Sequence, residues 1–431
     1  MTNTRKKKIL VVGNGAREHA IIWKLRQSQR LDQVYCTPGN AGIARDAITF
    51  DSDSDDNFSK LVERTKNQGI DYVIIGPEAP LAEGMADAFL DAGLKVFGPR
   101  KAAAQLEASK TFAKDFMKAA GIPTAAYQSF TEVEPAIAFA DSLGLPVVIK
   151  ADGLAAGKGV VVAQTRDEAV QAIRDNLEAK QFGEASTHVV VEEFLRGEEA
   201  SILVLCDGNI YVPLASAQDH KALHENDLGP NTGGMGAYSP APIVSDQVMR
   251  EIDDRILKPM HDQLIKQEIA YKGVIFVGLM ITADGPKVLE FNCRFGDPET
   301  EAVLPRLKND FVDVIEAVCN GTLHQHHLEW TDEAAVCVVL ASRGYPAAPE
   351  KGKTITGLED VDSDGKAVVF HAATSHNGKD IVSSGGRVLA VTALGRDIPR
   401  AIDAVYREVA RIHFDGAHFR KDIGQKALAR L

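Results

Sequence analysis

Short apolar runs alternate with amphipathic stretches through the first quarter of the chain. The apolar runs predict strands at Ile9–Val12, Val34–Thr37, Tyr72–Ile75 and Lys95–Phe97. The stretches between them have helical periodicity, as at Glu18–Gln27 and Phe58–Asn67. Strands that alternate with helices are typical of a parallel sheet covered by helices. We therefore expect a Rossmann-like α/β domain over residues 1–106.

A lysine-rich amphipathic helix is predicted at Ser109–Ala120, with Ser109 as its N-cap. After it, residues 126–195 predict a compact α+β lid. The lysines of the helix fall on a face other than its apolar stripe: Lys110, Lys114 and Lys118. The predicted elements of the lid are helices at Glu134–Leu143 and Asp167–Leu177 and strands at Val147–Lys150, Gly159–Ala163 and His188–Glu192.

Two further regions complete the predicted architecture. Residues 107–125 and 196–330 form a larger subdomain that carries the lid, and residues 331–431 form a β-rich C-terminal domain. The predicted strands of the larger subdomain include Ser201–Leu205 and Gly273–Ile281. The C-terminal elements are strands at Ala335–Ala341, Val368–Thr374 and Arg387–Thr392 and a helix at Ile398–Ile412. The expected fold is thus α/β and α+β in several domains.

Composition limits the classes of function. The chain of 431 residues is 45% hydrophobic and 25% charged, as in ordinary globular proteins. Its formal net charge of −12 argues against general binding to nucleic acid or anionic membranes, because both need excess cations. Its 5 cysteines are widely spaced without a C-x-x-C motif, which fits reduced thiols. No apolar run reaches the length of a signal or membrane segment, so we expect a cytoplasmic protein.

A glycine loop lies between the first predicted strand and helix. Gly13 and Gly15 would let backbone N–H groups approach an anion at the helix N-terminus. The loop is not a dinucleotide fingerprint, because Glu18 stands where a third glycine belongs. A phosphate-binding role and a plain tight turn therefore remain equal alternatives.

A second glycine loop runs from Lys150 to Val162 and departs from the P-loop pattern, since no Ser or Thr follows Lys158. Lys150 ends an apolar strand, and Lys158 lies in the loop itself. Two cations facing one glycine loop suit a polyphosphate, with charge-assisted hydrogen bonds of roughly 1.5–3 kcal/mol each. A surface hairpin with two solvated lysines is the weaker alternative.

The segment Lys287–Arg294 is the most informative strand. A period of two places Glu290, Asn292 and Arg294 on one face. Carboxylate and amide oxygens are hard ligands suited to magnesium, and an arginine beside them can hold a phosphoryl or carboxylate oxygen. An ordinary half-exposed strand with a polar face is the alternative.

Three other segments carry weaker signals. The strand end at Glu192–Glu199 is acidic, and such ends are common. The loops at 216–221 and 229–239 are dense in glycine and polar groups, which suits either ligand binding or a long connection. The cluster His324–His327 is interpreted as a solvated helix end rather than a metal site.

Together these segments resemble the ATP-grasp superfamily and, within it, the phosphoribosylamine–glycine ligase family of purine biosynthesis. The resemblance runs nearly end to end. It rests on GNGAREH at 13–19, PGNAG at 38–42, GPEAPLAEG at 76–84, SKTFAKDFM at 109–117, KADGLAAGKGVVVA at 150–163, EEFLRGEEAS at 192–201, AQDHK at 217–221, GPNTGGMGAYSPAP at 229–242, EFNCRFGDPET at 290–300 and GGRVL at 385–389.

The resemblance implies a reaction in which ATP, glycine and 5-phospho-β-D-ribosylamine give glycinamide ribonucleotide, ADP and phosphate through a glycyl phosphate. It also implies small-molecule substrates and a monomer, with a dimer as the alternative. ATP and Mg²⁺ are the expected cofactors, with Mn²⁺ as a substitute. The nearest alternatives are a carboxylating ATP-grasp enzyme and a nucleotide-binding sensor without activity; the motifs at 38–42 and 217–221 and an intact Lys158 argue against them.

The resemblance also assigns roles to residues of this sequence. Those implied to orient the reacting substrates are Arg294, Asp219 and Lys221. Those implied to bind ATP are Lys110, Lys150, Gly157, Lys158, Gly159, Glu192, Glu193, Phe194, Leu195 and Glu199. Those implied to form the sugar-phosphate pocket are Gly13, Asn14, Gly15, Arg17, Glu18, His19, Pro77, Glu78 and Asp297. The implied metal ligands are Glu290 and Asn292. One departure is Ala222, where the family pattern has an arginine after the DHK run.

Overall fold

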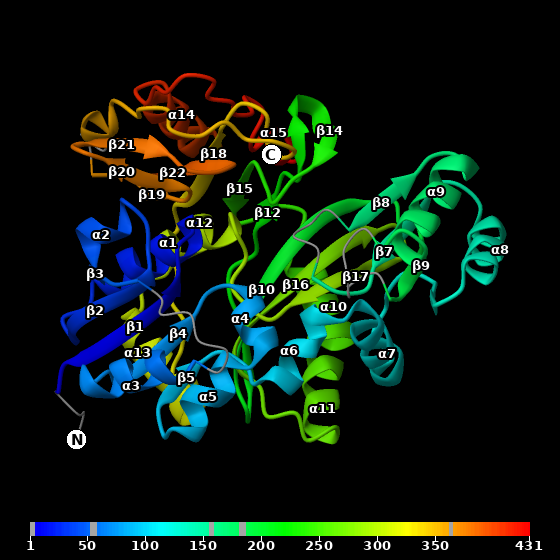
Figure 1. The fold of residues 1–431 in the computed structure, drawn as a ribbon, viewed down its shortest axis with the longest axis horizontal. Helices are drawn as coiled ribbons and strands as arrows, with labels where there is room; N and C mark the ends of the chain where they lie inside the picture. The colour runs from blue at the N-terminus through cyan, green and yellow to red at the C-terminus, as the bar shows by residue number, and fades with distance from the viewer. Residues whose placement is uncertain (1–4, 52–57, 155–158, 181–186, 362–364) are drawn as a thin grey trace.

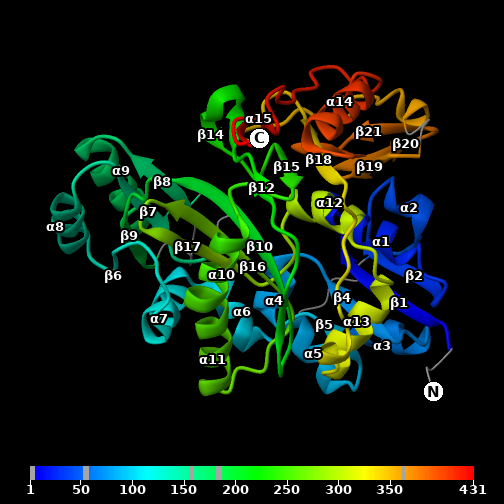
Figure 2. The ribbon, with the colours of Figure 1, turned by 180° about the vertical axis from the view of Figure 1, so that it is seen from behind.

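The computed structural model of the chain describes residues 5–51, 58–154, 159–180, 187–361 and 365–431. Three bodies surround a central region in Figure 1: the N-terminal domain, the lid and the C-terminal domain, with the larger subdomain between them. Seen from behind in Figure 2, helix α13 (Phe311–Asn320) lies beside the N-terminal sheet although it is distant in sequence. The predicted multidomain α/β and α+β architecture is confirmed.

The N-terminal sheet has the strand order β3-β2-β1-β4-β5, and all of its neighbouring strands are parallel. Buried aliphatic side chains on its faces explain why these short runs form strands covered by helices. The strands are Lys7–Gly13, Leu31–Pro38, Ile48–Thr49, Tyr72–Ile75 and Lys95–Phe97 for β1 to β5. The helices are Ala16–Leu25, Ile43–Asp46, Ser59–Asn67, Glu78–Glu83, Met85–Asp91 and Lys101–Ala108 for α1 to α6.

The larger subdomain is built on an antiparallel sheet of order β11-β10-β16-β17. Helix α7 (Lys110–Ala120) packs against it through Phe116, which meets Phe291 edge to face. As predicted, Ser109 is the N-cap of this helix and accepts a hydrogen bond from the N–H of Phe112. The strands are Glu198–Asp207, Tyr211–Pro213, Lys272–Thr282 and Gly285–Asn292 for β10, β11, β16 and β17. The helices on its outer side are α10 (Asp246–Ile252) and α11 (Lys258–Lys266), joined by Asp253–Leu257.

The lid is a four-stranded antiparallel sheet of order β6-β9-β7-β8 with two helices on one face. Its core is made of alanine and β-branched side chains that also seat the helices. The strands are Tyr127–Phe130, Val147–Ala151, Val160–Ala163 and Val189–Glu193 for β6 to β9. The helices are α8 (Val133–Leu143) and α9 (Arg166–Leu177).

The C-terminal domain contains the order β12-β15-β18-β22-β19, so two strands from the middle of the chain extend its sheet. The amphipathic helix α14 (Ile398–Val409) covers this sheet. The strands are Gln218–Asp219, Gly236–Ser239, Ala334–Ala341, Ala367–His371 and Arg387–Gly395 for β12, β15, β18, β19 and β22. Two hairpins flank it: β13–β14 (Ala222–His224, Leu228–Asn231) and β20–β21 (Thr374–Asn377, Asp380–Ser383). Two short helices also contact the C-terminal domain: α12 (Glu299–Val303), which packs against β15 and β18, and α15 (Gln425–Leu428), which packs against α14.

Two expectations differ from the structure. The strand predicted at Val368–Thr374 is two strands, because the chain leaves the sheet after His371 and Thr374 begins a separate hairpin. The strand predicted at Lys287–Arg294 ends at Asn292, so Arg294 lies beyond it. Within α7, Lys114 is buried, 2% exposed, although Lys118 one turn later is exposed. The cause is an acidic partner from the lid, described below. Among the described residues, no helix is both long and apolar enough to cross a membrane.

Candidate active site

One cleft of about 550 Å³ lies where the lid, the larger subdomain and the two terminal domains meet. Most of the residues predicted for a site contribute to its lining: Arg17, Glu78, Lys110, Lys150, Gly159, Glu192, Glu193, Phe194, Leu195, Glu199, Asp219, Lys221, Glu290, Asn292, Arg294 and Asp297. Predicted residues absent from its lining are Gly13, Asn14, Gly15, Glu18, His19 and Pro77. Gly157 and Lys158 lie outside the described residues.

The cleft is also lined by residues to which the sequence assigned no role in a site. They are Glu107, Lys114, Thr232, Gly233, Glu299, Tyr345 and Arg387 among others. A second, mostly apolar cavity of about 210 Å³ lies within the lid, between α8 and α9. Because its charged lining is limited to Asp141 and Arg166, which pair with each other, it offers little for a polar substrate.

At the lid end of the cleft, Glu192 forms ion pairs with two lysines. Its Oε2 lies 2.9 Å from Nζ of Lys150 and 3.1 Å from Nζ of Lys114. Burial would raise the pKa of Glu192, but the two lysines outweigh it and lower that pKa. The carboxylate therefore stays ionised inside the protein. The period-two register of β7 and β9 brings Lys150 and Glu192 onto one face of the lid sheet.

The chain after Glu192 leaves the lid sheet and forms the wall of the cleft. The N–H of Glu193 donates to the carbonyl of Ala126, and its side chain accepts from the N–H of Ala126 at 3.0 Å. In the described part of the chain, no hydrogen-bond partner is recorded for the N–H of Leu195. A backbone donor at a cleft wall suits a heterocyclic base edge.

Lys110 begins α7 at the opposite wall and faces the second glycine loop. Its Nζ donates to the carbonyl of Gly153 at 3.1 Å, and its backbone N–H donates to the carbonyl of Asp152. Burial lowers the pKa of Lys110, against the effect of Glu290. Helix α7 is therefore hydrogen-bonded to the residues that directly follow β7, where the glycine loop begins. The N-terminus of α7 also turns positive partial charge toward this region.

The centre of the cleft holds one ionised acid among cations. Nζ of Lys221 lies 3.2 Å from Glu199 and 3.8 Å from Glu290. Enclosure of Glu290 would raise its pKa, but Lys221, Lys150 and Lys110 lower it to about 2. Glu199 and Asp219, which lie near Lys221, raise the pKa of Lys221, although burial opposes this. Glu290 and Lys221 thus keep their charges at neutral pH.

Arg294 lies at the end of β17 and binds two acids from the N-terminal half of the chain. Its NH2 is 3.0 Å from Oε1 of Glu107, and its Nε is 3.3 Å from Oε2 of Glu78. The same guanidinium lies 3.4 Å from Oδ1 of Asn292. Burial raises the pKa of Glu107 to about 6, with Arg294 opposing. Arg294 is held rigidly at the junction of two domains.

A pair of buried acids lies beneath Lys221. Burial raises the pKa of Asp219 well above its usual value; Lys221 opposes this, and nearby Glu299 adds to it. Glu299 accepts a hydrogen bond from the hydroxyl of Ser201 at 3.0 Å. One acidic proton in this pair would be available close to the cleft. Glu299 belongs to the motif at 290–300, but the sequence assigned it no role, because acidic first turns of helices are common.

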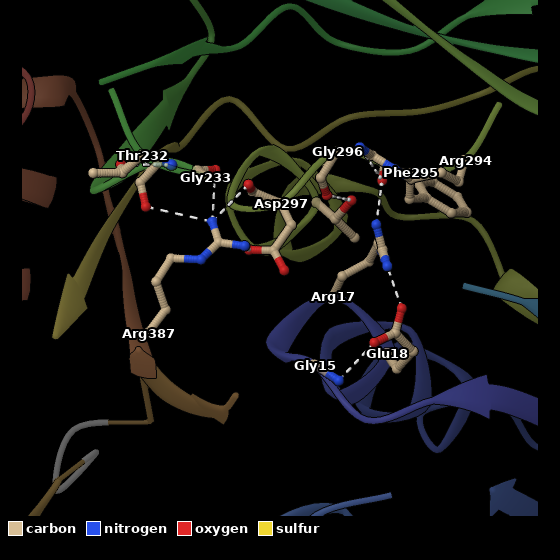
Figure 3. Close-up of polar contacts among 12 residues, drawn as sticks. Gly15, Arg17, Glu18, Thr232, Gly233, Arg294, Phe295, Gly296, Asp297 and Arg387 are labelled. Atoms are coloured by element: carbon tan, nitrogen blue, oxygen red, sulfur yellow. Dashed lines mark hydrogen bonds and ion pairs between the residues drawn. The ribbon is translucent and has the colours of Figure 1, made fainter. Parts of the chain in front are cut away.

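The first glycine loop is closed by its own helix. The N–H of Gly15 donates to Oε2 of Glu18 at 2.6 Å, so that carboxylate occupies the place an external anion would take. Arg17 instead points to the cleft region: its Nε donates to Glu18 at 2.6 Å, and its NH1 donates to the carbonyl of Phe295 at 3.1 Å (Figure 3). Arg17 thereby joins α1 to the turn that precedes Asp297.

His19 lies at the junction with the C-terminal domain. Its Nδ1 accepts from the N–H of His371 at 2.8 Å, and its Nε2 lies 3.0 Å from Asp46. Burial, with Arg45 and Arg26, lowers the pKa of His19 to about 3, so its ring is neutral. These contacts give His19 a packing role and offer no support for placing it in a substrate pocket. Asn14 also faces this junction, since its carbonyl accepts from Asn40.

The C-terminal domain contributes Arg387 from the start of β22. Its NH1 donates to the carbonyls of Gly233 at 2.6 Å and Asp297 at 2.9 Å, and its NH2 pairs with Asp297 Oδ1 at 3.1 Å (Figure 3). The hydroxyl of Tyr345 accepts from the N–H of Gly233 at 3.0 Å. Two loops that the sequence considered separately, 229–239 and 295–299, are therefore held together by this domain.

The hairpin after Lys221 shows how the departure at Ala222 is accommodated. The carbonyl of Ala222 accepts a hydrogen bond at 3.1 Å from Arg420, a fully buried arginine of the C-terminal segment. The same guanidinium pairs with Asp227 at 3.0 Å and with Asp422 at 2.7 Å. Asp227 is further paired with Lys426. The hairpin is thus anchored by cations outside its own sequence.

The donor set of the cleft fits a phosphate-bound divalent cation better than a protein-only metal site. No cluster of three or more His, Cys, Asp or Glu side chains that could hold a metal was found within the described ranges. Glu290 and Asn292 lie two residues apart on β17, so both face the cleft. One ionised carboxylate and one amide oxygen leave the remaining positions for phosphate and water, as is usual for magnesium. His324 and His327 are exposed and carry no such site.

Comparison with known proteins covers nearly the whole chain. Family models described as the N domain, the ATP-grasp (A) domain and the C domain of phosphoribosylglycinamide synthetase match residues 7–107, 108–300 and 335–426. A phosphoribosylamine–glycine ligase of Allochromatium vinosum is 50% identical over 98% of this chain and 99% of its own length. The ligase of Halalkalibacterium halodurans is 48% identical over 98% and 97%, respectively.

Solved structures show the same architecture. The phosphoribosylamine–glycine ligase of Thermotoga maritima has a TM-score of 0.82 and 33% identity, covering 96% of this chain and 100% of that one. A biotin carboxylase from Campylobacter jejuni shares the fold alone, with a TM-score of 0.76 and 14% identity over 100% of this chain and 96% of that one. Three matched domains in one order, together with these relatives, establish the relationship. The chain belongs to the phosphoribosylglycinamide synthetase family.

Proposed function

We propose that this chain joins glycine to 5-phospho-β-D-ribosylamine at the expense of ATP, giving glycinamide ribonucleotide, ADP and phosphate. The observation that carries the proposal is the charge arrangement of the cleft. Lys110, Lys150, Lys221 and Arg294 all lower the pKa of Glu290. Four cations around one ionised acid suit a polyphosphate with its metal better than a neutral substrate. The family and its ligase relatives supply the identity of the acid and the amine.

The chemistry explains why ATP is needed. A carboxylate does not accept an amine at neutral pH, because the leaving group would be oxide. Transfer of the γ-phosphoryl group to a carboxylate oxygen of glycine makes glycyl phosphate and ADP. The amine then attacks the carbonyl carbon, and the C–O bond to phosphate breaks. Such a path needs no protein nucleophile; it needs positioning and neutralisation of charge, to which the rigidly paired cleft residues are suited.

In this proposal the lid side of the cleft binds ATP. Lys110 and Lys150 neutralise phosphate charge, together with Gly159 and with Gly157 and Lys158 of the same loop. The segment from Glu192 through Glu193 and Phe194 to Leu195 holds the adenine edge, with the N–H of Leu195 as its donor. Glu199, whose carboxylate lines the cleft, accepts from the ribose hydroxyls. The same carboxylate lies 3.2 Å from Nζ of Lys221.

We assign Glu290 and Asn292 to a divalent cation, Mg²⁺ with Mn²⁺ as a substitute. Such a cation supplies Lewis-acid neutralisation of phosphoryl oxygens when bound. The contribution of the chain is to keep Glu290 ionised, and the pKa of about 2 ensures this throughout the neutral range. Asn292 is oriented through its contact with Arg294 at 3.4 Å.

The opposite side of the cleft takes the two substrates that are joined. Arg294 orients the glycine carboxylate, and Asp219 with Lys221 lies where the amine approaches. The pocket for the sugar phosphate includes Arg17, Glu78 and Asp297, which line the cleft. Gly13, Asn14, Gly15, Glu18, His19 and Pro77 shape its outer wall rather than contact substrate directly. The domain limits proposed for this arrangement are 1–106, 107–125 with 196–330, 126–195 and 331–431.

The surroundings of the enzyme follow from the same proposal. Its substrates are small molecules, and a cytoplasmic location agrees with five buried, unpaired cysteines among the described residues. We propose a monomer as the working state.

Isotope transfer tests this proposal and its intermediate together. Glycine labelled with ¹⁸O in both carboxylate oxygens should deliver one labelled oxygen to the inorganic phosphate formed. The amide product should keep the other. Phosphate without label would show that the carboxylate is not phosphorylated and would refute the proposed route. Omission of the amine is the control, because it should abolish labelled phosphate release.

A further inference from the structure

Lys114 is the residue that ties the lid to the larger subdomain. It belongs to α7, outside the lid, yet its side chain is only 3% exposed. Nζ of Lys114 lies 3.1 Å from Oε2 of Glu192, at the end of the last lid strand. The same Nζ donates to the hydroxyl of Thr124 at 2.8 Å, in the segment that enters the lid. One ammonium group therefore contacts both chain crossings between the two bodies.

The contacts extend from this ammonium into both bodies. The Thr124 hydroxyl passes its hydrogen bond on to the carbonyl of Val288 in β17 at 2.7 Å. The N–H of Val288 donates back to the carbonyl of Pro123 at 2.8 Å. On the lid side, Nζ of Lys114 lies 5.4 Å from the ring centroid of Tyr127, the first residue of β6. The strand proposed to hold the metal and the strand proposed to hold adenine are thus linked through one side chain.

The electrostatics favour a structural charge at this position. Burial lowers the pKa of Lys114 to about 8, while Glu192 opposes that change. Removal of one member of a buried ion pair leaves the other uncompensated, which is strongly unfavourable. Lys150 alone would then have to keep Glu192 ionised, and Oε1 of Glu192 has no hydrogen-bond partner among the described residues. Without Lys114, the Glu192 carboxylate would therefore lose one of its two ion pairs and would be held less firmly in its buried position.

From these contacts we infer that Lys114 is a positioning residue that fixes the lid on the larger subdomain and holds Glu192 beneath the nucleotide. This inference rests on the proposed function, because it assumes that a nucleotide occupies the lid end of the cleft. Lys114 acts through Glu192 and Thr124, and it takes no part in the transfer of the phosphoryl group.

Three variants test the inference: Lys114→Met, Thr124→Val and the control Lys118→Met. Lys118 lies one turn further along α7 and is exposed, so its variant matches the first in chemistry and helix. Hydrogen exchange of backbone amides at 123–127 and 192–196 reports the two crossings. Calorimetric titration with ADP reports nucleotide binding without any need for turnover, which keeps a failure of the proposed reaction distinguishable.

Lys114→Met should weaken ADP binding by about tenfold or more and speed amide exchange at both crossings. Thr124→Val should speed exchange at both crossings as well, because it cuts the same link while leaving Lys114 in place. Lys118→Met should change neither quantity. The inference is overturned if Lys114→Met matches Lys118→Met. It is overturned also if Lys114→Met weakens ADP binding while exchange at the crossings stays unchanged, since that would make Lys114 a direct nucleotide ligand.

Discussion

Arg294 and Glu107 form an ion pair 3.0 Å apart at the junction of the N-terminal half of the chain with β17. Glu107 also accepts a hydrogen bond from the N–H of Cys293 at 2.7 Å. The acid therefore fixes both the guanidinium and the backbone from which it extends. The angle at which Arg294 enters the cleft depends on a residue that contributes no obvious sequence motif.

Glu107 should give the protein a distinctive dependence of stability on pH. Its folded pKa of about 6 lies above its usual 4.5, mainly because of burial, so the folded state holds its proton more tightly. Its stabilising contribution is present below pH 4.5 and is lost as the pH rises to 6. The free energy of unfolding of the native protein, relative to Glu107→Gln, should fall by about 1.3 kcal/mol over that range, out of about 2 kcal/mol for the whole titration.

Urea unfolding of both proteins at pH 4.5 and 6.5 measures this difference. A difference that stays constant or grows with pH would contradict the assigned burial of the Glu107 carboxyl. Glu193→Gln serves as a control, because Glu193 is another acid of the cleft and its side chain is 42% exposed.

Glu290→Gln should lower kcat by about a hundredfold or more, because the variant loses an ionised oxygen on the face of β17 that we propose binds the metal. Stability should change little, within about 1 kcal/mol, since the Glu290 side chain is 42% exposed. Steady-state kinetics and thermal unfolding measure the two effects separately. A variant that unfolds instead would make Glu290 a structural residue of a half-exposed strand.

Arg387→Ala should loosen the contact between the C-terminal domain and two loops of the cleft. The variant loses hydrogen bonds to Gly233 and Asp297, at a cost of about 1.5–3 kcal/mol. Chemical denaturation measures the loss, and limited proteolysis should show faster cleavage within 229–239. Arg387→Lys should recover little, because an ammonium cannot reproduce the fork of a guanidinium.

Arg396→Ala is the matched control for that substitution. Arg396 also belongs to the C-terminal domain, but its side chain is 77% exposed and, within the part of the chain that the structure describes, pairs only with the adjacent Asp397. Equal destabilisation by the two alanine variants would show that Arg387 does not hold the loops.

Asn40 should prove important for the docking of the C-terminal domain on the N-terminal domain. Its Nδ2 donates to the carbonyls of Asn14 at 2.9 Å and His371 at 2.8 Å, and its Oδ1 accepts from Gly42 at 2.9 Å. Asn40→Ala should cost about 2 kcal/mol, the sum of several modest hydrogen bonds.

Asn40→Asp separates the two halves of that amide. The variant keeps an acceptor for Gly42 but places a carboxylate beside two carbonyl oxygens. It should be at least as destabilised at pH 7 as Asn40→Ala, when both are measured by urea unfolding. An aspartate variant as stable as the native protein would mean that the donor half contributes nothing.

Elements with a strong pattern could be predicted from the sequence. The apolar run before Gly13 and the serine cap before Lys110 are local features, and both appear where local rules place them. The break after His371 could not be predicted, because its hydrogen bond to His19 comes from a segment far away in the sequence. The burial of Lys114 was missed for the same reason: a helix face alone does not reveal that Glu192 of the lid lies against it.

The residues of the cleft show the same difference between local pattern and tertiary packing. Glu290 and Asn292 share strand β17, so the period of two was enough to place them on one face, and Arg294 follows two residues after its end. Glu107 and Arg387 come from segments far from β17 in the sequence, and only tertiary packing brings them to the cleft. Glu18 shows the opposite case: its place in a glycine loop suggested a ligand site, while the structure makes it the cap of its own helix.

The most direct test of the central claim is the substrate dependence of ADP release, followed with a coupled assay. The account predicts ADP only when glycine and phosphoribosylamine are both present, with glycinamide ribonucleotide formed in equal amount. Release of ADP with bicarbonate in place of glycine, or with the amine omitted at an undiminished rate, would contradict it.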